Sequence, residues 1–441
     1  MYSESISKIK WDDVLDSDIV FIGIFTFNAQ RGYQLARHIK KNSNAIVVMG
    51  GMHASLNYHE AVEHCDYVLI GEGDESIVEF IKAVNDSDAH IGIPASVPGI
   101  AYKKGNRILF TGERRPPENI DIIPDRNLLY RYDKMAGHNT LWAQVHASRG
   151  CPHDCDYCAV VRHLGRKVRK RTPENIVEDI RRSIAFHEKG FFPRLSKVVW
   201  ITDDNFFADR DWTISVLRKI IDSGIKYSFT VQARYEVGFD DEMLELLKKA
   251  GFIELAVGIE FLEDESFKLH NKSCSYDRIV KSVKNIQKHG LNVRGLFIVG
   301  ADTHGEGIGQ KIADFVTDNN IHGVLIQSMY FVPSTPAYEK NKDRLIHQNW
   351  KKYVGHVVHY PVKISPYDLQ QEIITAITKI YSLKRLIHAI FHEKWIAEIL
   401  FIGEFFWLRS IRANLKRELP YLKSNELNQL ITKQLEPQKA V

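Results

Sequence analysis

The chain has 441 residues, of which 44% are hydrophobic and 26% charged, and its formal net charge is +4. This length predicts two or three domains with the composition of an ordinary soluble globular protein. The small net charge argues against nucleic-acid binding, no apolar run is long enough to cross a bilayer, and residues 1–18 are too polar for a secretory signal, so we expect a cytoplasmic protein.

Residues 1–90 alternate between strand-like and helix-like segments. Apolar runs at 18–25, 45–49 and 67–70 predict buried strands, and residues 30–41 predict a helix. This alternation indicates a Rossmann-like (flavodoxin-like) parallel sheet. Each predicted strand ends in a turn that contains glycine, where the backbone can approach a ligand, although ordinary turn chemistry would explain an isolated glycine pair equally well.

Residues 91–140 are rich in proline, with short strands between 99 and 110, and we interpret them as a linker. From 141 to 340 the alternation of strands and helices resumes. Six strand-like segments predict a partial (βα)6 TIM-like barrel, whose ligands collect at the carboxyl ends of the strands. These segments are 141–147, 197–201, 227–232, 254–258, 292–298 and 323–330. Thr172 is the predicted N-cap of a helix that begins at Pro173.

Three of the five cysteines, Cys151, Cys155 and Cys158, lie within eight residues directly after the first of these strands. Thiolates are the usual ligands of iron–sulfur clusters, and three of them can hold three irons of a [4Fe–4S] cube. The fourth iron then stays open to a small molecule, as the open position does in catalytic zinc sites. A structural zinc site is the alternative, although no second closely spaced cysteine pair is present. The histidines that could complete it are His146, His153 and His163.

This C-x3-C-x2-C spacing, with the aromatic Tyr157 before the third cysteine, resembles the signature of the radical S-adenosylmethionine (radical SAM) superfamily. The resemblance implies that the three cysteines hold the cluster and that the amine and carboxylate of SAM chelate the open iron. It also implies cleavage of SAM to a 5′-deoxyadenosyl radical, which abstracts hydrogen from a substrate carbon. The electron would come from an external donor of the flavodoxin or ferredoxin type.

The polar residues at the ends of the predicted barrel strands have the chemistry that SAM requires. Carboxylates accept hydrogen bonds from an ammonium group and ribose hydroxyls, and arginine pairs with a carboxylate. Each residue alone could instead cap a helix or form a salt bridge, for example between Glu260 and Arg234. The resemblance implies cofactor contacts for Tyr157, Asp203, Asp204, Asn205, Gln232, Arg234, Glu260 and Pro333. No residue is assigned as catalytic.

The glycine turns of residues 1–90 together resemble the later half of the cobalamin-binding domain that precedes many radical SAM modules. The resemblance implies cobalamin as a possible cofactor and methyl transfer to carbon as the reaction. The chain begins at about the third strand of that five-stranded fold, so we expect a shortened module with an exposed sheet edge and an incomplete pocket. The candidate residues for cobalamin are Gly23, Thr26, Gly50, Gly51, His53, Gly71, Glu72 and Gly73.

Two alternatives remain open. In the first, the N-terminal module is structural and the enzyme is a cobalamin-independent cyclase or rearrangement enzyme. In the second, the protein is a non-catalytic metal-binding scaffold.

Residues 341–441 predict a mostly helical region that is apolar at helical spacing between 395 and 411, with basic residues on both sides. We interpret this stretch as a helix that packs on the barrel. A helix at a membrane surface, or a lid over an apolar substrate, is the alternative. We therefore expect a small-molecule or lipid-like substrate, with peripheral membrane contact as a further possibility.

Overall fold

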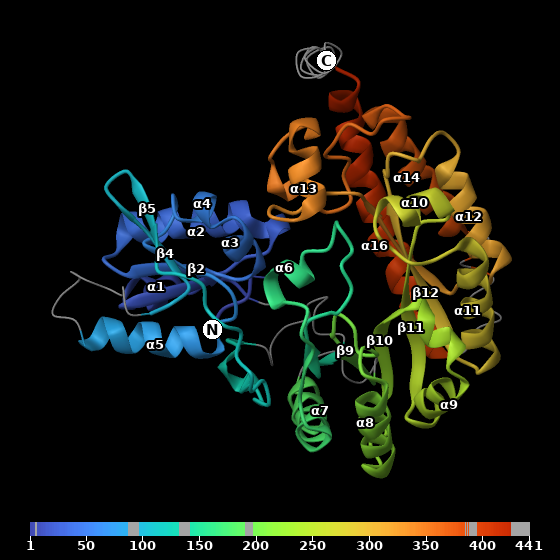
Figure 1. Cartoon of the computed structure of the whole chain (residues 1–441), viewed down its shortest axis with the longest axis horizontal. Helices are drawn as coiled ribbons and strands as arrows, with labels where there is room; N and C mark the ends of the chain where they lie inside the picture. The colour runs from blue at the N-terminus through green and yellow to red at the C-terminus, as the bar shows by residue number, and fades with distance from the viewer. Residues whose placement is uncertain are drawn as a thin grey trace.

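The computed structural model describes residues 1–4, 7–86, 97–131, 142–189, 197–383, 385, 387 and 395–424, the last range with side chains only for 405, 406 and 408–424. It is an α/β structure with two larger sheets. Figure 1 shows the N-terminal sheet beside the barrel, with the short helix α6 (Val160–Leu164) between them.

The N-terminal sheet has the strand order β1-β2-β3-β4-β5. Its strands are β1 (Ile19–Gly23), β2 (Ile46–Gly50), β3 (Tyr67–Leu69), β4 (Ile100–Lys104) and β5 (Arg107–Phe110). The first three are parallel, as predicted, whereas β4 and β5 form an antiparallel hairpin that pairs with β3. Part of the segment predicted as a linker therefore extends the sheet, and β1 is its other edge among the described strands.

Short and long helices precede or connect these strands. They are α1 (Trp11–Leu15), α2 (Ala29–Asn42), α3 (Met52–Leu56), α4 (Tyr58–Ala61), α5 (Gly73–Asp86) and the 3-10 turn η1 (Thr26–Asn28). The helix α2 buries Tyr33, Ala36 and Ile39 against the sheet, because apolar residues at spacings of three and four fall on one helix face.

The turn after β2 is closed by the chain itself. The His53 side chain is fully buried, with Nδ1 3.3 Å from Thr26 Oγ1 and Nε2 3.1 Å from the Tyr33 hydroxyl. The Trp350 ring packs on its edge, with ring centroids 5.0 Å apart. Residues from the C-terminal region thus complete the core of the N-terminal module.

The buried His53 predicts an acid-sensitive module. Burial lowers the pKa of His53 to about 4, whereas an unfolded histidine titrates near 6.5. The folded state therefore binds fewer protons, so stability is present above pH 6.5 and is lost as the pH falls towards 4. Between pH 6.5 and 5 this loss is about 2 kcal/mol. Urea unfolding at both pH values should show that His53→Gln weakens the pH dependence by about this amount.

The exposed His59 on the neighbouring helix α4 provides the control for this measurement. His59→Gln should leave the pH dependence as in the wild type. An equal pH dependence in the wild type and His53→Gln would contradict the burial argument.

The second sheet has six parallel strands in the order β6-β9-β10-β11-β12-β13. They are β6 (Ala143–Val145), β9 (Val198–Ile201), β10 (Ser228–Arg234), β11 (Phe252–Glu260), β12 (Asn292–Val299) and β13 (Gly323–Ser328). The connecting helices lie on the outside of this partial TIM-like barrel (Figure 1). They are α7 (Pro173–His187), α8 (Arg210–Asp222), α9 (Asp241–Lys249), α10 (Asp264–Leu269), α11 (Tyr276–Lys288) and α12 (Ile308–Asp318). The predicted cap is confirmed, because Thr172 accepts a hydrogen bond from the Asn175 N–H at 3.3 Å.

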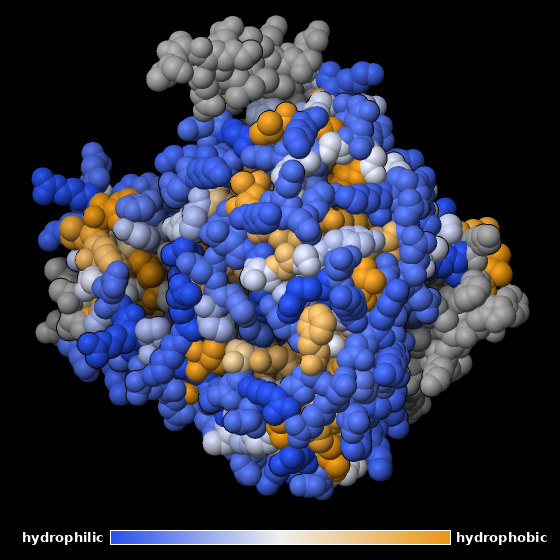
Figure 2. Space-filling view, turned by 45° about the vertical axis from the view of Figure 1, so that its right-hand side comes forward, coloured by the Kyte–Doolittle hydropathy of each residue, from blue (hydrophilic) through white to orange (hydrophobic). Residues whose placement is uncertain are grey.

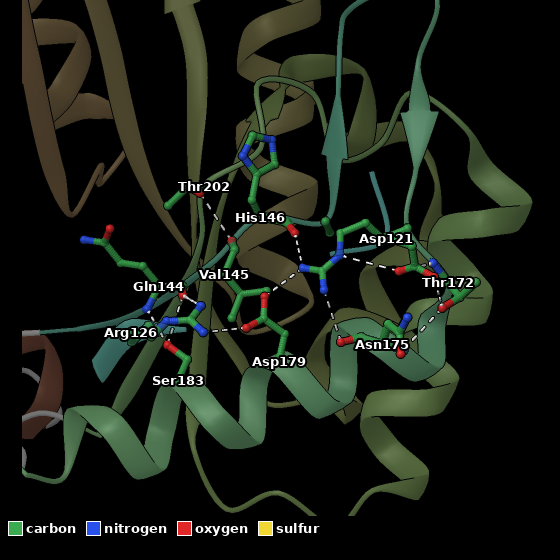
Figure 3. A network of polar contacts seen from close by, with 12 residues as sticks. Asp121, Arg126, Gln144, Val145, His146, Thr172, Asn175, Asp179, Ser183 and Thr202 are labelled. Carbon is green, nitrogen blue, oxygen red and sulfur yellow. Dashed lines mark hydrogen bonds and ion pairs between the residues drawn. The ribbon is translucent and has the colours of Figure 1, made fainter. Parts of the chain in front are cut away.

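A polar network fixes β6, the edge strand of the barrel, to α7 (Figure 3). The buried Asp179 carboxylate accepts hydrogen bonds from Arg126 at 2.6 Å and Arg171 at 2.7 Å. Arg126 also donates to the Gln144 carbonyl at 2.8 Å, and Arg171 donates to the His146 carbonyl at 2.9 Å. Both arginines thus satisfy one buried carboxylate and hold the strand that leads to the cysteines.

The C-terminal region consists of α13 (Pro336–Asn341), α14 (Pro366–Ile380), α16 (Trp395–Leu422) and the 3-10 turn η7 (Trp350–Lys352). The helix α14 packs against α12 and β13, and α16 packs against α14. Most side chains of the apolar stretch predicted at 395–411 lie outside the described ones. Among the described helices, none combines the length and apolar character needed to cross a membrane. The face in Figure 2 is mostly hydrophilic, with apolar side chains in scattered groups.

Candidate active site

A small hairpin presents the three cysteines. The strand β7 (Ser148–Arg149) pairs with β8 (Arg169–Lys170), and the cysteine loop lies between them. Gly150 has a φ of +94°, and an added Cβ would lie 2.5 Å from the Lys167 carbonyl oxygen, so only glycine fits. The Cys151 N–H donates to the Gly165 carbonyl at 3.3 Å, which closes the loop.

The donor set of this loop suits an iron–sulfur cluster. All three cysteines are free and partly exposed, and burial raises the pKa of the Cys158 thiol to about 12. Such thiols become ligands when metal binding removes their protons. No three His, Cys, Asp or Glu side chains of the described residues converge on one metal ion. A four-iron cube binds each thiolate through a different iron, so its ligands need not converge.

Two residues that follow β9, Asp203 and Asn205, contact the start of the cysteine loop. Asp203 is buried, and its two carboxylate oxygens accept hydrogen bonds from the Ala147 N–H at 2.6 Å and the Ser148 hydroxyl at 2.5 Å. Burial raises the pKa of Asp203 to about 7, although these hydrogen bonds oppose the shift. The Asn205 amide lies 3.8 Å from Cys151 Sγ. Asp203 thus ties the barrel to the start of the cysteine loop, and its oxygens are already occupied.

Asp204 differs from its neighbour Asp203. Its side chain is partly buried, and burial raises its pKa to about 6. No described residue donates a hydrogen bond to its carboxylate, and it interacts electrostatically with the Cys158 thiol. A half-buried acceptor without a partner, next to a cysteine loop, is suited to a cationic ligand group.

The next two barrel strands contribute the remaining predicted polar side chains. Gln232 lies opposite Ala256 and Arg234 opposite Gly258, so these two side chains share a face of β10. Arg234 pairs with Glu236, with Nη2 2.8 Å from Oε1, and also interacts with the Cys155 thiol. The considered salt bridge between Arg234 and Glu260 is absent from the described contacts, because both residues have other partners.

Glu260 occupies a strained position at the end of β11. Its φ is +66°, and the register with β12 shifts between Gly258 and Glu260. Such bulges and left-handed residues redirect a side chain and cluster at functional sites. The buried Lys272 lies beside it, with Nζ 3.5 Å from Glu260 Oε1.

Tyr157 lies within the cysteine loop itself, and Pro333 lies in the turn that follows β13. The Tyr157 ring meets the Phe261 ring edge-on, with centroids 6.2 Å apart, and burial raises its pKa above the usual value. Pro333 is buried in the turn between β13 and α13. This turn reaches the N-terminal module, because the Ser334 hydroxyl donates to the Leu56 carbonyl at 2.7 Å.

A cavity of about 310 Å³ lies between the N-terminal module and the cysteine loop. Turns after β1 and β2 form one wall, the cysteine loop forms another, and the ends of β12 and β13 form the floor. Most of its lining is apolar. The lining side chains include Phe25, Thr26, Phe27, Met52, Tyr157, Cys158, Ile298, Met329, Tyr330 and Val332.

The residues proposed for cobalamin are divided by the structure into two groups. Thr26 lines the cavity, and open space of at least 4 Å would surround an added Cβ at Gly23 and Gly71. An added Cβ at Gly50 would meet Leu69 at ordinary contact distance, with the carbonyl oxygen at 3.7 Å and Cβ at 4.0 Å.

The residues of the second group already contact other residues of the chain. Gly51 packs on the Ile24 backbone, where an added Cβ would lie 2.8 Å from its carbonyl oxygen, and Gly73 packs on Ile77. Both ring nitrogens of His53 have partners. The Glu72 carboxylate pairs with Arg149 and Arg169, which flank the cysteine loop, each at 2.6 Å.

Sequence reasoning missed Lys272, His270 and the two arginines. Arg149 stands only two positions before Cys151, which was a local signal for a role in this loop. The histidine and lysine lie more than a hundred positions after the cysteines, and no local pattern singles them out.

Residues 145–316 match the family model described as the radical SAM superfamily. A bacteriochlorophyllide d C-12(1)-methyltransferase of Chlorobaculum tepidum is 25% identical and covers 82% of this chain and 75% of the relative. A hopanoid C-2 methylase of Rhodopseudomonas palustris is 24% identical and covers 78% of this chain and 62% of the relative. The structure of the cobalamin-dependent SAM radical enzyme OxsB, with aqua-cobalamin and SAM bound, superposes with a TM-score of 0.65 at 14% identity, over 97% of this chain and 68% of that one.

Proposed function

We propose that the chain, whose residues 145–316 match the radical SAM family model, is a cobalamin-linked radical SAM methyltransferase that acts on an apolar substrate. One observation carries the proposal: the 310 Å³ apolar cavity is bounded by the N-terminal module on one side and by the cysteine loop on the other. A methyl carrier held by the module and a radical formed at the cluster would therefore reach the same space.

Cys151, Cys155 and Cys158 would ligate the [4Fe–4S] cluster, which would pass to SAM the electron needed for its cleavage to a 5′-deoxyadenosyl radical. The electron itself would come from an external donor. Asn205 near Cys151 and Arg234 near Cys155 provide hydrogen-bond donors to the thiolates. Such outer contacts orient metal ligands and stabilise their charge.

The proposed SAM contacts follow from how far each carboxylate is already occupied by partners within the chain. Asp204 has no described partner and suits the ammonium group, while Glu260 projects from its bulge and suits ammonium or ribose hydroxyls. Gln232 is exposed on the same strand face as Arg234, which can pair with the SAM carboxylate. Asp203 and Asn205 are proposed to shape the loop, because both Asp203 oxygens already accept hydrogen bonds from residues that lead into it.

The apolar lining indicates the substrate class. Phe25 and Phe27 are about half exposed, at 53% and 50%, and their rings are parallel at the cavity wall. Apolar pocket walls with a few polar groups are typical of sites for hydrophobic small molecules. Two of the relatives, a bacteriochlorophyllide d methyltransferase and a hopanoid methylase, agree with a large apolar substrate. The walls would hold the substrate carbon near the radical and exclude water.

Cobalamin, when bound, would supply the methyl group. Thr26 lines the cavity, and the backbone at Gly23 and Gly71 leaves room for a ligand. The sealed His53 and the ion-paired Glu72 favour the second candidate, a cobalamin-independent cyclase in which the module only shapes the pocket.

Anaerobic reconstitution with iron and sulfide, followed by reduction with dithionite in the presence of SAM, tests the proposal. We expect about four irons per chain, release of 5′-deoxyadenosine and one equivalent of bound cobalamin. Release of 5′-deoxyadenosine without cobalamin binding would favour the cyclase. A protein that binds one zinc ion and leaves SAM intact would refute both candidates.

A further inference from the structure

The C-terminal turn of α10 has a geometry that fixes the residues after it. The Lys272 N–H donates to the Phe267 carbonyl at 2.9 Å, and the Asn271 N–H donates to the Lys268 carbonyl at 3.4 Å. Asn271 has a φ of +53°. These two bonds around a left-handed residue form a Schellman motif, which asparagine tolerates better than most residues. The positions of His270 and Lys272 on either side of Asn271 are therefore set by the helix end.

Lys272 points from this turn towards the end of β11. Its side chain is only 2% exposed, its Nζ donates to the Gly258 carbonyl at 2.8 Å, and Nζ lies 3.5 Å from Glu260 Oε1. The Glu260 carboxylate folds over Gly258, where an added Cβ would lie 2.7 Å from Oε1. A buried ammonium thus contacts both the backbone before the bulge and the carboxylate after it. This arrangement holds Glu260 in its left-handed conformation.

His270 contacts the cysteine loop instead. Its Nδ1 lies 2.9 Å from Asp156 Oδ1, and Asp156 stands between Cys155 and Cys158. The His270 ring stacks on Phe261 with centroids 5.1 Å apart and meets the Tyr157 ring at 5.7 Å. One helix end therefore holds two separate parts of the site, the cysteine loop and the Glu260 carboxylate.

We propose that His270 and Lys272 are positioning residues that fix the distance and orientation of the Glu260 carboxylate relative to the iron–sulfur cluster. This inference rests on the proposed function, in which Glu260 contacts SAM. The two residues act through Asp156 and Glu260 and do not touch the reacting atoms. The bulge at Glu260 and the buried Lys272 then have a common purpose, because an ordinary strand end would direct residue 260 elsewhere.

Lys272→Met in the reconstituted protein tests the contact between Lys272 and Glu260. We expect the Kd for SAM to rise about 10- to 100-fold, since a hydrogen bond to a charged group is lost and Glu260 can relax. The iron content should stay at the wild-type level. Lys272→Arg keeps a donor and should recover part of the affinity. Lys268→Met removes an exposed lysine from the same helix and is the matched control.

His270→Phe tests the contact between His270 and Asp156. It keeps an aromatic ring against Phe261 and removes the hydrogen bond to Asp156. We expect the electron paramagnetic resonance spectrum of the reduced cluster with SAM to change, while the cluster still assembles. His270→Asn, which retains a polar group near the Nδ1 position, should restore the wild-type spectrum. A merely structural role would lower stability without altering this spectrum.

The possible failures are distinct. A wild-type protein that does not bind or cleave SAM would overturn both the proposed function and the positioning role of His270 and Lys272. The positioning role alone would be overturned if the wild-type protein cleaves SAM and neither variant shows its expected effect. In that case Lys272→Met would match Lys268→Met in SAM affinity, and His270→Phe would give the wild-type spectrum.

Discussion

Replacing Cys155 by alanine is expected to abolish reductive cleavage of SAM. The loop offers three thiols for three irons, so the loss of one leaves the cube with two protein ligands. The neighbouring Asp156 remains held by His270, so the loop itself should keep its shape. Iron content, the visible absorption of the reconstituted protein and the yield of 5′-deoxyadenosine measure the effect.

The control for this experiment is Cys65→Ala, which removes a buried free cysteine of the N-terminal module, far from the loop in sequence. It should keep the wild-type iron content and SAM cleavage. Full cluster loading and turnover in Cys155→Ala would show that the cluster has a different ligand set.

The parts of this structure that could be predicted from sequence depend on local patterns. The apolar runs of β2 and β9 and the Thr172 cap identify themselves within a few residues. The three cysteines are also a local signal, because their spacing alone suggests a cluster. The parallel order of the barrel strands follows from alternating strands and helices.

The parts that could not be predicted depend on pairing between distant residues. Glu72 was assigned to cobalamin from its glycine-rich turn, yet its carboxylate meets arginines 77 and more positions away. The resemblance implies a SAM contact for Asp203, whereas its oxygens accept hydrogen bonds from the Ala147 N–H and the Ser148 hydroxyl. No sequence pattern distinguishes a carboxylate with free oxygens from one whose oxygens are occupied, because the difference arises only in the folded chain.

Replacing Glu72 by glutamine is expected to lower the free energy of unfolding by about 3–5 kcal/mol, the usual cost of removing one partner from a buried ion pair. The Glu72 and Arg169 side chains are each only 5% exposed, and Arg149 stands opposite Arg169 in the β7–β8 hairpin. Without the Glu72 charge, the hydrogen bonds that Arg169 keeps among the described residues are those to the Pro117 and Leu164 carbonyls. Urea unfolding of the apo protein measures the loss.

Glu72→Gln should also lower the loading of the cluster. An ion pair that only stabilises the fold would not have this second effect. Arg149 precedes Gly150 and Cys151 directly, so a displaced hairpin would shift Cys151, the first proposed cluster ligand. Of the two carboxylates that hold Arg149, only Asp74, at 2.7 Å, would keep its charge. Glu63→Gln removes an exposed carboxylate that pairs with Lys103 and should cost at most about 1 kcal/mol. Equal stability of Glu72→Gln and Glu63→Gln would show that water can replace the ion pairs of Glu72 with Arg149 and Arg169. A stability loss with unchanged cluster loading would show that Glu72 joins the two sheets without positioning the cysteines.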